Sequence, residues 1–517
     1  HCGPKNIIWD LAFAGMGLQN VLAAFSVIAT GGFLFGYIIG INGNVVTKGQ
    51  LICPTDWTGP VGSWSSSGYG QCYALSAWDQ GILSSLNLIG AVVSSAICFR
   101  YADTLGRKKE VQIGAALYMT GALLAALSPV LWGIYIGFLV YGLGIGFCMH
   151  AAPVYIAEIA PAAIRGTLVS GKEMVIVLGI VSGFAFGAIF AGWHQDGWRG
   201  MTILAAFAAA FVEVGITFIP NSPRWLVLRS VQTASLLQGG NDFEEEAKEA
   251  LAFFRKGAGA EEIDSEFMAM INDAREASAG SSRVGCAEVL RYPKPLLIGC
   301  GLVFFQQVTG QPSVLYFATN IFKARGEAAR HSLHHLPRRL VRSATAPSVG
   351  HRGDGGRLGP AGLILRVPKL LGRCAHLQVP GRPGLGAPKL GHCHSKGLEE
   401  VLALMLYVSS YQVGFGPISW LMISEIFPLG VRGSALSTAA MVNFGSNIIM
   451  TLCQTALMDA LTPSGAFFLY LAFAILSLVF VYFVVPETKG KTLEQIEAEL
   501  TRPKARGPFP EAVAASA

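Results

Sequence analysis

EIAPAAIRG, at residues 158–166, returns as EIFPLGVRG at residues 425–433. Glu, Ile, Pro, Arg and Gly occupy the same five positions in both copies, and each copy follows one long apolar segment and precedes another. Recurrence in one fixed register and in matching surroundings indicates an internal duplication. The sequence therefore predicts two halves that run in the same direction through the same structural environment.

Long apolar segments fill most of the chain on both sides of this repeat. The chain of 517 residues is 52% hydrophobic and only 14% charged. A helix needs about 20 apolar residues to cross a bilayer. The segments lack two-residue alternation, so they are expected to be helices rather than strands. The sequence predicts an all-α membrane protein with ten candidate spans, two of them within 111–149 and the others near 21–43, 78–99, 174–192, 200–220, 296–322, 401–424, 435–457 and 465–485.

Five short motifs follow one another along this framework. They are DTLGRKK at 103–109, PNSPRW at 220–225, QQVTG at 306–310, GPISW at 416–420 and PETKG at 486–490. In this order and at this spacing they resemble the sugar porter family of the major facilitator superfamily. The resemblance implies two parallel six-helix halves related by an axis along the membrane normal. It covers the chain except for residues 324–397.

The resemblance divides the chain into four parts. Residues 1–220 are the N-terminal six-helix half, and 221–292 are a cytoplasmic linker with amphipathic helices, indicated by the Glu-, Ala- and Lys-rich stretch at 242–274. Residues 293–486 are the C-terminal half, and 487–517 are a cytoplasmic tail.

Longer runs resemble one branch of the family. YGLGIGFCMHAAPVYIAE, LVSGKEMVIVLGI, FFQQVTGQPSVLYF and YQVGFGPISWLMISEIFP are similar to plant and algal vacuolar or plastid glucose-transporter-like proteins. The resemblance implies a multi-pass protein of the vacuolar or plastid membrane, with the plasma membrane as the other option. The expected partners are a monosaccharide and the lipid bilayer, and the carrier is expected to be able to work as a monomer. No cofactor is expected.

Amides and one indole are the expected sugar-binding groups. A hexose offers hydroxyls, which donate and accept hydrogen bonds, and an apolar ring face, so amides and an indole suit it. The resemblance assigns these roles to a set of five residues: Gln306, Gln307, Gln412, Asn447 and Trp420. A buried amide in an apolar helix costs a few kcal/mol unless it has a partner. Gln306 and Gln307 therefore indicate either a polar cavity or hydrogen bonds between helices. Pro312 follows them and is expected to break the helix.

Charged groups decide whether sugar transport is coupled to protons. Glu173, next to Lys172, is expected either to bind sugar or a proton or to form a surface ion pair with Lys172. Proton-linked relatives carry an Asp and an Arg in spans one and four, where this chain has Ile38 and Phe138. Replacing only one of the two charges would leave the other unpaired in a low-dielectric site, which is costly, so the absence of both is physically reasonable. This favours facilitated diffusion, with proton symport through Glu173 as the alternative.

Charges at the cytoplasmic ends of the spans are expected to hold the gate through ion pairs that break and re-form as the halves rock. The expected gating residues lie in the DTLGRKK motif and in the two copies of the repeat: Asp103, Gly106, Arg107, Glu158, Arg165, Glu425 and Arg432.

Residues 324–397 differ from the rest in composition. They hold seven of the ten His and a net charge of +11, whereas the whole chain carries only +6. The basic character therefore rests on this window, and no nucleic-acid partner is predicted. Back-translation of residues 355–362 in a shifted frame permits Val-Asp-Asp-Leu-Gly-Arg-Arg, the counterpart of the motif at 103–108. The sequence thus predicts that spans eight and nine are missing or scrambled here by a frameshift, with a basic insertion as the alternative.

Cysteine and histidine spacing gives no metal motif such as C-x-x-C, and no metal site is expected. Clustered histidines such as His334 and His335 are explained as out-of-frame residues. Cys53 and Cys72 share a loop at 44–77 that has few basic residues, which is typical of the non-cytoplasmic side. A disulfide and two free thiols are equally open there.

A hexose facilitator that works by alternating access is the function that the sequence predicts. A transporter-like sugar sensor is a second hypothesis, although such sensors carry longer tails, and a non-functional frameshifted product is a third. An enzyme is not expected, because no nucleophile–base set, metal spacing or phosphate loop is present.

Overall fold

A computed structural model describes the architecture of the chain. The residues that it describes are 17–46, 50–53, 61–62, 72–161, 164–190, 196–237, 241–279, 289–312, 314–315, 406–407, 410–411, 414–427, 431–487 and 500. The window at 324–397 lies outside them.

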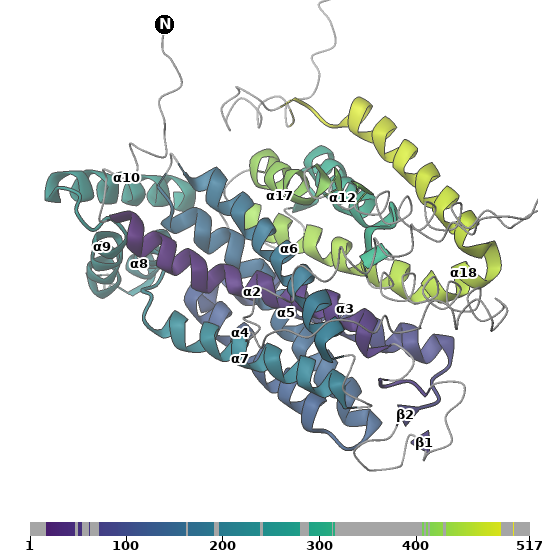
Figure 1. Cartoon of the computed structure of the whole chain (residues 1–517). Helices are drawn as coiled ribbons and strands as arrows, with labels where there is room; N and C mark the ends of the chain where they lie inside the picture. The colour runs from purple at the N-terminus through teal and green to yellow at the C-terminus, as the bar shows by residue number, and fades with distance from the viewer. Residues whose placement is uncertain are drawn as a thin grey trace, which may run out of the picture. The chain divides into compact units, whose positions relative to one another are not determined.

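Helices make up nearly all of the described chain (Figure 1). The N-terminal part contains α2 (Gly17–Val45), α3 (Ala77–Leu105), α4 (Arg107–Leu127), α5 (Leu131–Ile159), α6 (Arg165–Phe190) and α7 (Gly197–Thr217). Three shorter helices follow, which are α8 (Pro223–Leu237), α9 (Asn241–Phe254) and α10 (Ala260–Ala279). The C-terminal part contains α12 (Pro293–Val308), α17 (Phe415–Ile426) and α18 (Arg432–Val484). The two short strands are β1 (Val61–Gly62) and β2 (Cys72–Tyr73), paired in parallel.

Eight helical segments in the described chain are long and apolar enough to cross a bilayer, and they confirm eight of the ten predicted spans. They are Leu18–Val45, Trp78–Ala102, Arg107–Leu127, Leu131–Ile159, Arg165–Phe190, Gly197–Thr217, Gly433–Gln454 and Gly465–Val484. The last two belong to the one helix α18, which turns back on itself in Figure 1. Helices α12 and α17 cover only parts of the two remaining spans, because the neighbouring residues lie outside the described chain.

Close approach of α2 and α6 depends on glycine. A Cβ on Gly36 would lie 2.0 Å from the carbonyl oxygen of Ile176, and one on Gly40 would lie 2.4 Å from that of Ile180. Small residues let helix backbones meet in a bilayer, where lipid competes for every apolar face. These glycines therefore fix the first span against the fifth.

Arg199 joins the start of α7 to the end of α4. Its guanidinium donates hydrogen bonds to the carbonyl oxygens of Ala126 at 2.6 Å and Ser128 at 2.7 Å. It also contacts Asp196 and lies 4.5 Å from the centre of the Trp198 ring. The last carbonyls of a helix lack partners within the helix and attract a cation, so Arg199 holds the turn between α4 and α5.

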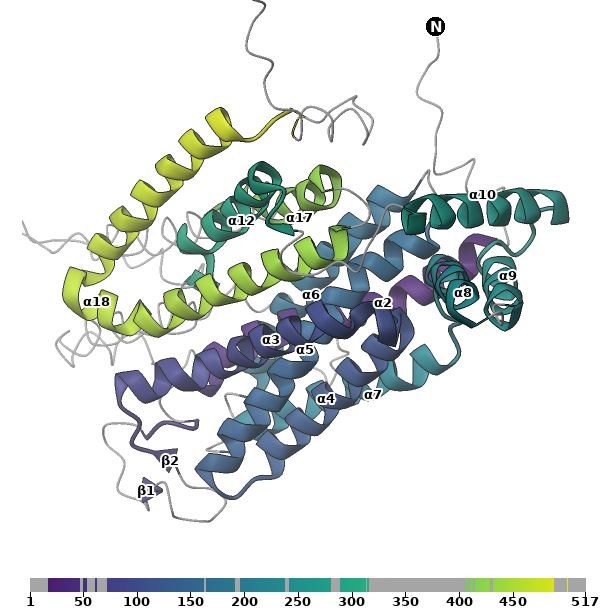
Figure 2. The same ribbon diagram turned by 180° about the vertical axis from the view of Figure 1, so that it is seen from behind.

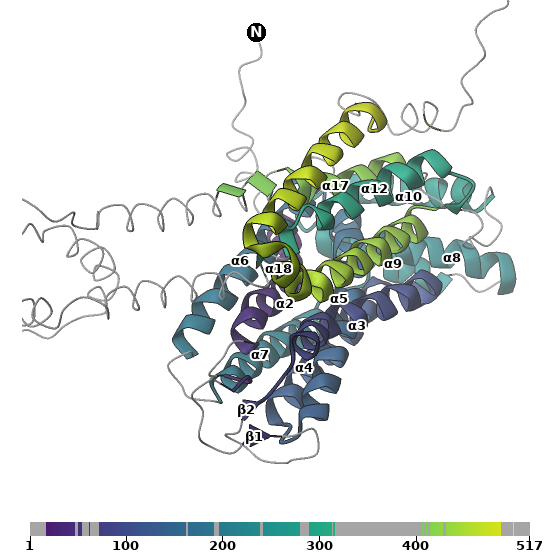
Figure 3. The same cartoon turned by 90° about the vertical axis from the view of Figure 1, so that its right-hand side faces the viewer.

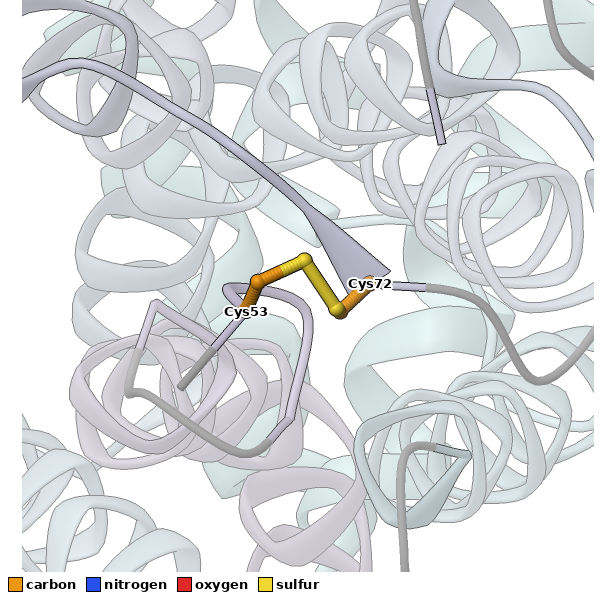
Figure 4. The surroundings of a disulfide bond; sticks show 2 residues. All are labelled: Cys53 and Cys72. Carbon is orange, nitrogen blue, oxygen red and sulfur yellow. A yellow bond between two sulfur atoms is a disulfide. The ribbon is translucent and has the colours of Figure 1, made fainter. Parts of the chain in front are cut away.

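Cys53 and Cys72 form a disulfide, so the structure contains one of the two arrangements that the sequence left open (Figure 4). Tyr73 extends the link, because its amide donates to the carbonyl of Leu51 at 2.8 Å. Gln50 accepts a hydrogen bond from the amide of Trp198 at 3.0 Å. The loop is thereby tied to the start of α7, at the same side of the membrane as the α4–α5 turn.

Helices α8, α9 and α10 pack on one another at one end of the long helices, as Figures 1 and 2 show. Arg255 ties them to that end, because it pairs with Glu266 at 2.8 Å and donates to the carbonyl of Ile159 at 2.9 Å. Asn20 at the start of α2 also donates to the carbonyl of Phe253 at 2.7 Å. The end of the fourth span and the start of the first are thus anchored to these helices.

The C-terminal helices share an apolar core. Ile298 and Leu302 of α12, Ile423 and Ile426 of α17, and Ala435 of α18 are buried in one cluster. Helices α12 and α17 lie side by side (Figure 3), and α18 runs along α3 of the N-terminal half. This packing places the end of α12 next to both α17 and α18.

Candidate functional site

The two adjacent glutamines lie in the last turn of α12. The helix ends at Val308, and Gly310 takes a φ of 98°, a conformation that favours glycine. A Cβ on Gly310 would also lie 2.5 Å from the ring of Tyr470. The chain re-enters helix at Gln311 and Pro312, so the break occurs two residues before the proline expected to cause it. Gln306 and Gln307 are therefore presented at the broken end of a membrane helix.

Gln306 links three helices. Its Nε2 donates to the carbonyl of Phe415 in α17 at 3.2 Å, and its Oε1 accepts from Nδ2 of Asn443 in α18 at 2.8 Å. This amide thus makes the helix–helix hydrogen bonds that the sequence left as one of two alternatives. Its first role is to hold α17 and α18 at the site.

Gln307 is placed differently from its neighbour. It is buried, yet its Oε1 has no hydrogen-bond partner among the described residues. Asn447, one helical turn beyond Asn443, is also buried and accepts from the hydroxyl of Thr451 at 3.1 Å. An unpartnered amide oxygen in an apolar surrounding is a position that a hydroxyl-bearing ligand would satisfy.

The other two expected sugar-binding residues of this half are only partly described. Trp420 is half-buried and packs against the apolar cluster of α12, α17 and α18. Gln412 lies outside the described residues.

Glu173 in α6 forms an ion pair with Lys172, with 2.9 Å between Oε1 and Nζ. The alternative of an ion pair is therefore present in the structure, although not at the surface, because the side chains of Lys172 and Glu173 are only 3% and 16% exposed. Lys172 lies against α2, where a Cβ on Gly32 would be 3.7 Å from its Cγ. A buried ion pair of this kind is costly to break one partner at a time.

Ile38 and Phe138 are each 1% exposed, so both positions of the absent charge pair are apolar and buried. Tyrosines supply the polar contacts nearby. Tyr141 donates to the carbonyl of Leu34 at 2.9 Å, and Tyr37 donates to that of Met201 at 2.9 Å. These bonds fix α2 to its neighbours without any ionisable carboxylate or guanidinium at either position.

The expected gating residues of the N-terminal half meet in part. Arg107 at the start of α4 pairs with Glu158 at the end of α5 at 3.4 Å. Arg107 follows Gly106, whose φ of 81° and contact with the Trp225 ring exclude a larger residue. The Oε2 of Glu158 and the Nε of Arg165 are buried without hydrogen-bond partners among the described residues.

Three other expected gating residues, Asp103, Glu425 and Arg432, lie in described helices. Their side chains fall outside what the structure describes. Their ion pairs stay predictions.

A family model described as "Sugar (and other) transporter" matches residues 24–329 and 390–500. The chain belongs to the sugar transporter family. This membership confirms the prediction of a multi-pass membrane sugar carrier. The match omits the residues between 329 and 390, which agrees with the prediction that spans eight and nine are missing from that stretch.

Curated relatives and solved structures of transporters support the same assignment. "D-xylose-proton symporter-like 2" of Arabidopsis thaliana is 40% identical over 91% of this chain and 89% of its own length. "D-xylose-proton symporter-like 3, chloroplastic" of the same plant is 38% identical over 96% of this chain and 84% of its own. The structure of the major facilitator proton:xylose symporter XylE from E. coli covers 94% of this chain and 100% of its own, with a TM-score of 0.62 and 22% identity. The sugar transporter therefore has the major facilitator fold.

One polar contact of the N-terminal half was not predicted from the sequence. Glu110 and His150 form a buried pair, with 3.1 Å between Oε2 and Nδ1. The signal was present, since a carboxylate and an imidazole stand in apolar helices, but their neighbouring positions in space follow only from the packing of α4 on α5.

Proposed function

We propose that this sugar transporter carries a monosaccharide, glucose or another hexose, across its membrane by alternating access. The observation that supports this proposal most is the amide set at the broken end of α12, where the buried Oε1 of Gln307 has no hydrogen-bond partner in the described part of the chain and lies next to the Gln306–Asn443 bond. Sugar hydroxyls donate to and accept from amides equally well. Trp420 supplies an apolar face for the ring. The protein acts as a carrier rather than an enzyme.

The Arg107–Glu158 ion pair belongs to one gate state of this cycle. It joins the cytoplasmic ends of the third and fourth spans, and the linker helices grip the same end through Arg255. Arg107 and Glu158 lie in the same half, so the pair breaks and re-forms as charged groups of the other half approach and leave these span ends during rocking. Asp103, Glu425 and Arg432 take corresponding roles at the other span ends.

Facilitated diffusion is the mode of transport that the described N-terminal half supports. Ile38 and Phe138 leave no titratable pair at the two positions where proton-linked relatives carry charges. Glu173 is engaged with Lys172. Transport then follows the sugar gradient alone.

Uptake into proteoliposomes tests this proposal. The protein is expressed from its own transcript, reconstituted, and given labelled glucose with or without an imposed pH gradient. The expected result is uptake to equal concentrations inside and outside, at the same level with and without the gradient. No uptake of any monosaccharide in a panel that includes glucose and xylose would overturn the sugar assignment.

Proton symport is the second candidate, because the relatives described above are named proton symporter-like proteins. Glu173 would be the proton carrier and Lys172 its partner in the unprotonated state. Accumulation above equilibrium that a protonophore abolishes would establish symport. Loss of that accumulation in Glu173→Gln, with exchange retained, would assign the proton to Glu173.

A plastid or vacuolar membrane is the proposed location, supported by the relative whose name describes it as chloroplastic. A fluorescent fusion of the full-length protein, imaged in a plant or algal cell with plastid and tonoplast markers, tests it. Fluorescence confined to the plasma membrane would contradict the proposal.

A further inference from the structure

Cys98, Glu110 and His150 converge from three different helices of the N-terminal half. They belong to α3, α4 and α5, and one ligand atom from each lies within 4.8 Å of the other two. Glu110 and His150 already touch, with 3.1 Å between Oε2 and Nδ1. The transport mechanism proposed above uses none of these side chains.

Burial makes the carboxylate of this group unusual. Glu110 is 0% exposed and His150 only 5%. The Oε1 atom of Glu110 has no hydrogen-bond partner among the described residues. Cys98 belongs to an apolar cluster with Ala102 and Phe147, so the surroundings exclude water. A buried carboxylate needs a cation or a full set of hydrogen bonds, and His150 satisfies only one of its two oxygens.

We propose that Cys98, Glu110 and His150 bind a divalent transition-metal ion, with Zn²⁺ as the ion that the ligands suit best. Thiolate, imidazole and carboxylate are the three side-chain ligands of Zn²⁺, and hard cations such as Mg²⁺ do not select sulfur. On binding, the Cys98 thiol releases its proton. A metal-bound imidazole is uncharged, so the thiolate and the Glu110 carboxylate neutralise the two positive charges of the ion. A neutral cluster is what a low-dielectric site requires.

The geometry needs little adjustment. Zn²⁺ holds its ligands at ~2.0–2.3 Å, which places tetrahedral ligand atoms roughly 3.5 Å apart. The present ligand atoms lie within 4.8 Å of one another, so closing the set around an ion shortens the longest separation by at most about 1.3 Å. Three protein ligands leave a fourth position for a water molecule or a further donor.

A metal ion at this site would hold three helices of the N-terminal half together near the expected gating residues. Glu110 is one turn beyond Arg107, and His150 lies two turns before Glu158 on α5. The ion would tie α3, α4 and α5 together one to two turns from the Arg107–Glu158 pair, so that the pair opens by movement of the side chains at the span ends and not by sliding of α4 along α5. Its role is structural and does not depend on whether the carrier transports a sugar.

Metal content of the purified full chain, carrying a histidine-free affinity tag, tests the site. Cys98→Ser, Glu110→Gln and His150→Gln are compared with the unchanged protein, and Cys148→Ser is the matched control. Cys148 is a buried thiol on the same helix as His150 but is not a member of the set. The expected result is that each of the three variants loses about one equivalent of zinc relative to the unchanged protein and to Cys148→Ser.

Cobalt substitution gives the independent readout. The Co²⁺-loaded protein is expected to show a thiolate-to-metal charge-transfer band that Cys98→Ser abolishes and Cys148→Ser retains. Residues 324–397 contain further His and Cys, so only the difference between variants identifies this site. Equal zinc content in all proteins, or a charge-transfer band unchanged by Cys98→Ser, would overturn the proposal. If Cys98→Ser does not fold, the near-isosteric Glu110→Gln decides by the same zinc difference.

Discussion

Gln307→Leu separates sugar binding from folding. Gln307 is buried and its Oε1 has no partner among the described residues, so leucine removes no hydrogen bond from that oxygen. Replacing an unsatisfied buried polar group by an apolar group of similar size is neutral or stabilising. The variant is therefore expected to keep the melting temperature of the unchanged protein in detergent, or to exceed it.

Gln306→Leu is the matched comparison on the neighbouring residue. It removes the donor to the carbonyl of Phe415 and the acceptor of the Asn443 amide. Hydrogen bonds between membrane helices contribute about 0.6 kcal/mol on average and up to about 1.7, so losing two costs about 1–3 kcal/mol. This variant is expected to melt at a lower temperature, because α12, α17 and α18 lose the amide that joins them.

Both variants are expected to bind sugar more weakly. Losing one hydrogen bond to a sugar hydroxyl costs about 1 kcal/mol, and 1.4 kcal/mol corresponds to a tenfold change in Kd, so KM for uptake should rise roughly five- to tenfold in Gln307→Leu. Glucose is expected to raise the melting temperature of the unchanged protein but to have little effect on Gln307→Leu at the same concentration. An unchanged KM in Gln307→Leu, or a melting temperature as low as that of Gln306→Leu, would refute this account of the amide pair.

Substitutions at three residues, one matched control substitution and one sequencing experiment test the fold and the reading frame. Arg199→Met should destabilise the protein by about 3 kcal/mol, because two charge-assisted bonds to the end of α4 are lost, and Arg199→Lys should recover part of this in a thermal melt. Gly36→Ala should cost about 1–3 kcal/mol through overpacking against α6, whereas Gly166→Ala, with nothing within 4 Å of its Cβ, should be neutral. Cys53→Ser should lower stability by about 3 kcal/mol and abolish the effect of a reductant on the melting temperature; a variant as reductant-sensitive as the unchanged protein would contradict the disulfide. Nucleotide sequencing of the transcript across 324–397 should reveal a frame that encodes two apolar spans, and an intact read of the present residues would refute the frameshift.

The membrane spans could be predicted from the sequence because their apolar segments are long and uninterrupted. A bilayer needs long uninterrupted apolar helices, and eight such segments in the described chain match the predicted ranges closely. That one helix, α18, contains both of the last two spans was not predicted, because helical geometry continues through residues 462–464, between the two predicted ranges. Pro463 lies within this stretch, and α18 continues beyond it.

The sequence did not show which faces of the membrane helices pack against one another. For Glu173 the sequence left two alternatives, a role in binding sugar or a proton and a surface ion pair with Lys172. The glycines of α2, Gly32 and Gly36 among them, let α6 approach so closely that Lys172 is covered. Which face of a helix meets a neighbour depends on contacts between residues far apart in the chain, and a single sequence does not show them. The Glu110–His150 pair was missed for the same reason.

Some buried polar groups of the described spans have hydrogen-bond partners and others have none, and this difference concerns several residues of the two proposed sites. Tyr141 and Gln306 have theirs, and their role is to fix helices against one another. Gln307, Glu110 and Glu158 each keep one buried oxygen without a partner. In a bilayer such an atom costs free energy unless a partner satisfies it. We propose that a bound sugar does so for Gln307, a metal ion for Glu110 and a rearranged gate for Glu158. The last case is supported by the buried Nε of Arg165, the second charge of the EIAPAAIRG segment, which has no hydrogen-bond partner among the described residues and would join Arg107 at the Glu158 carboxylate once the span ends move together.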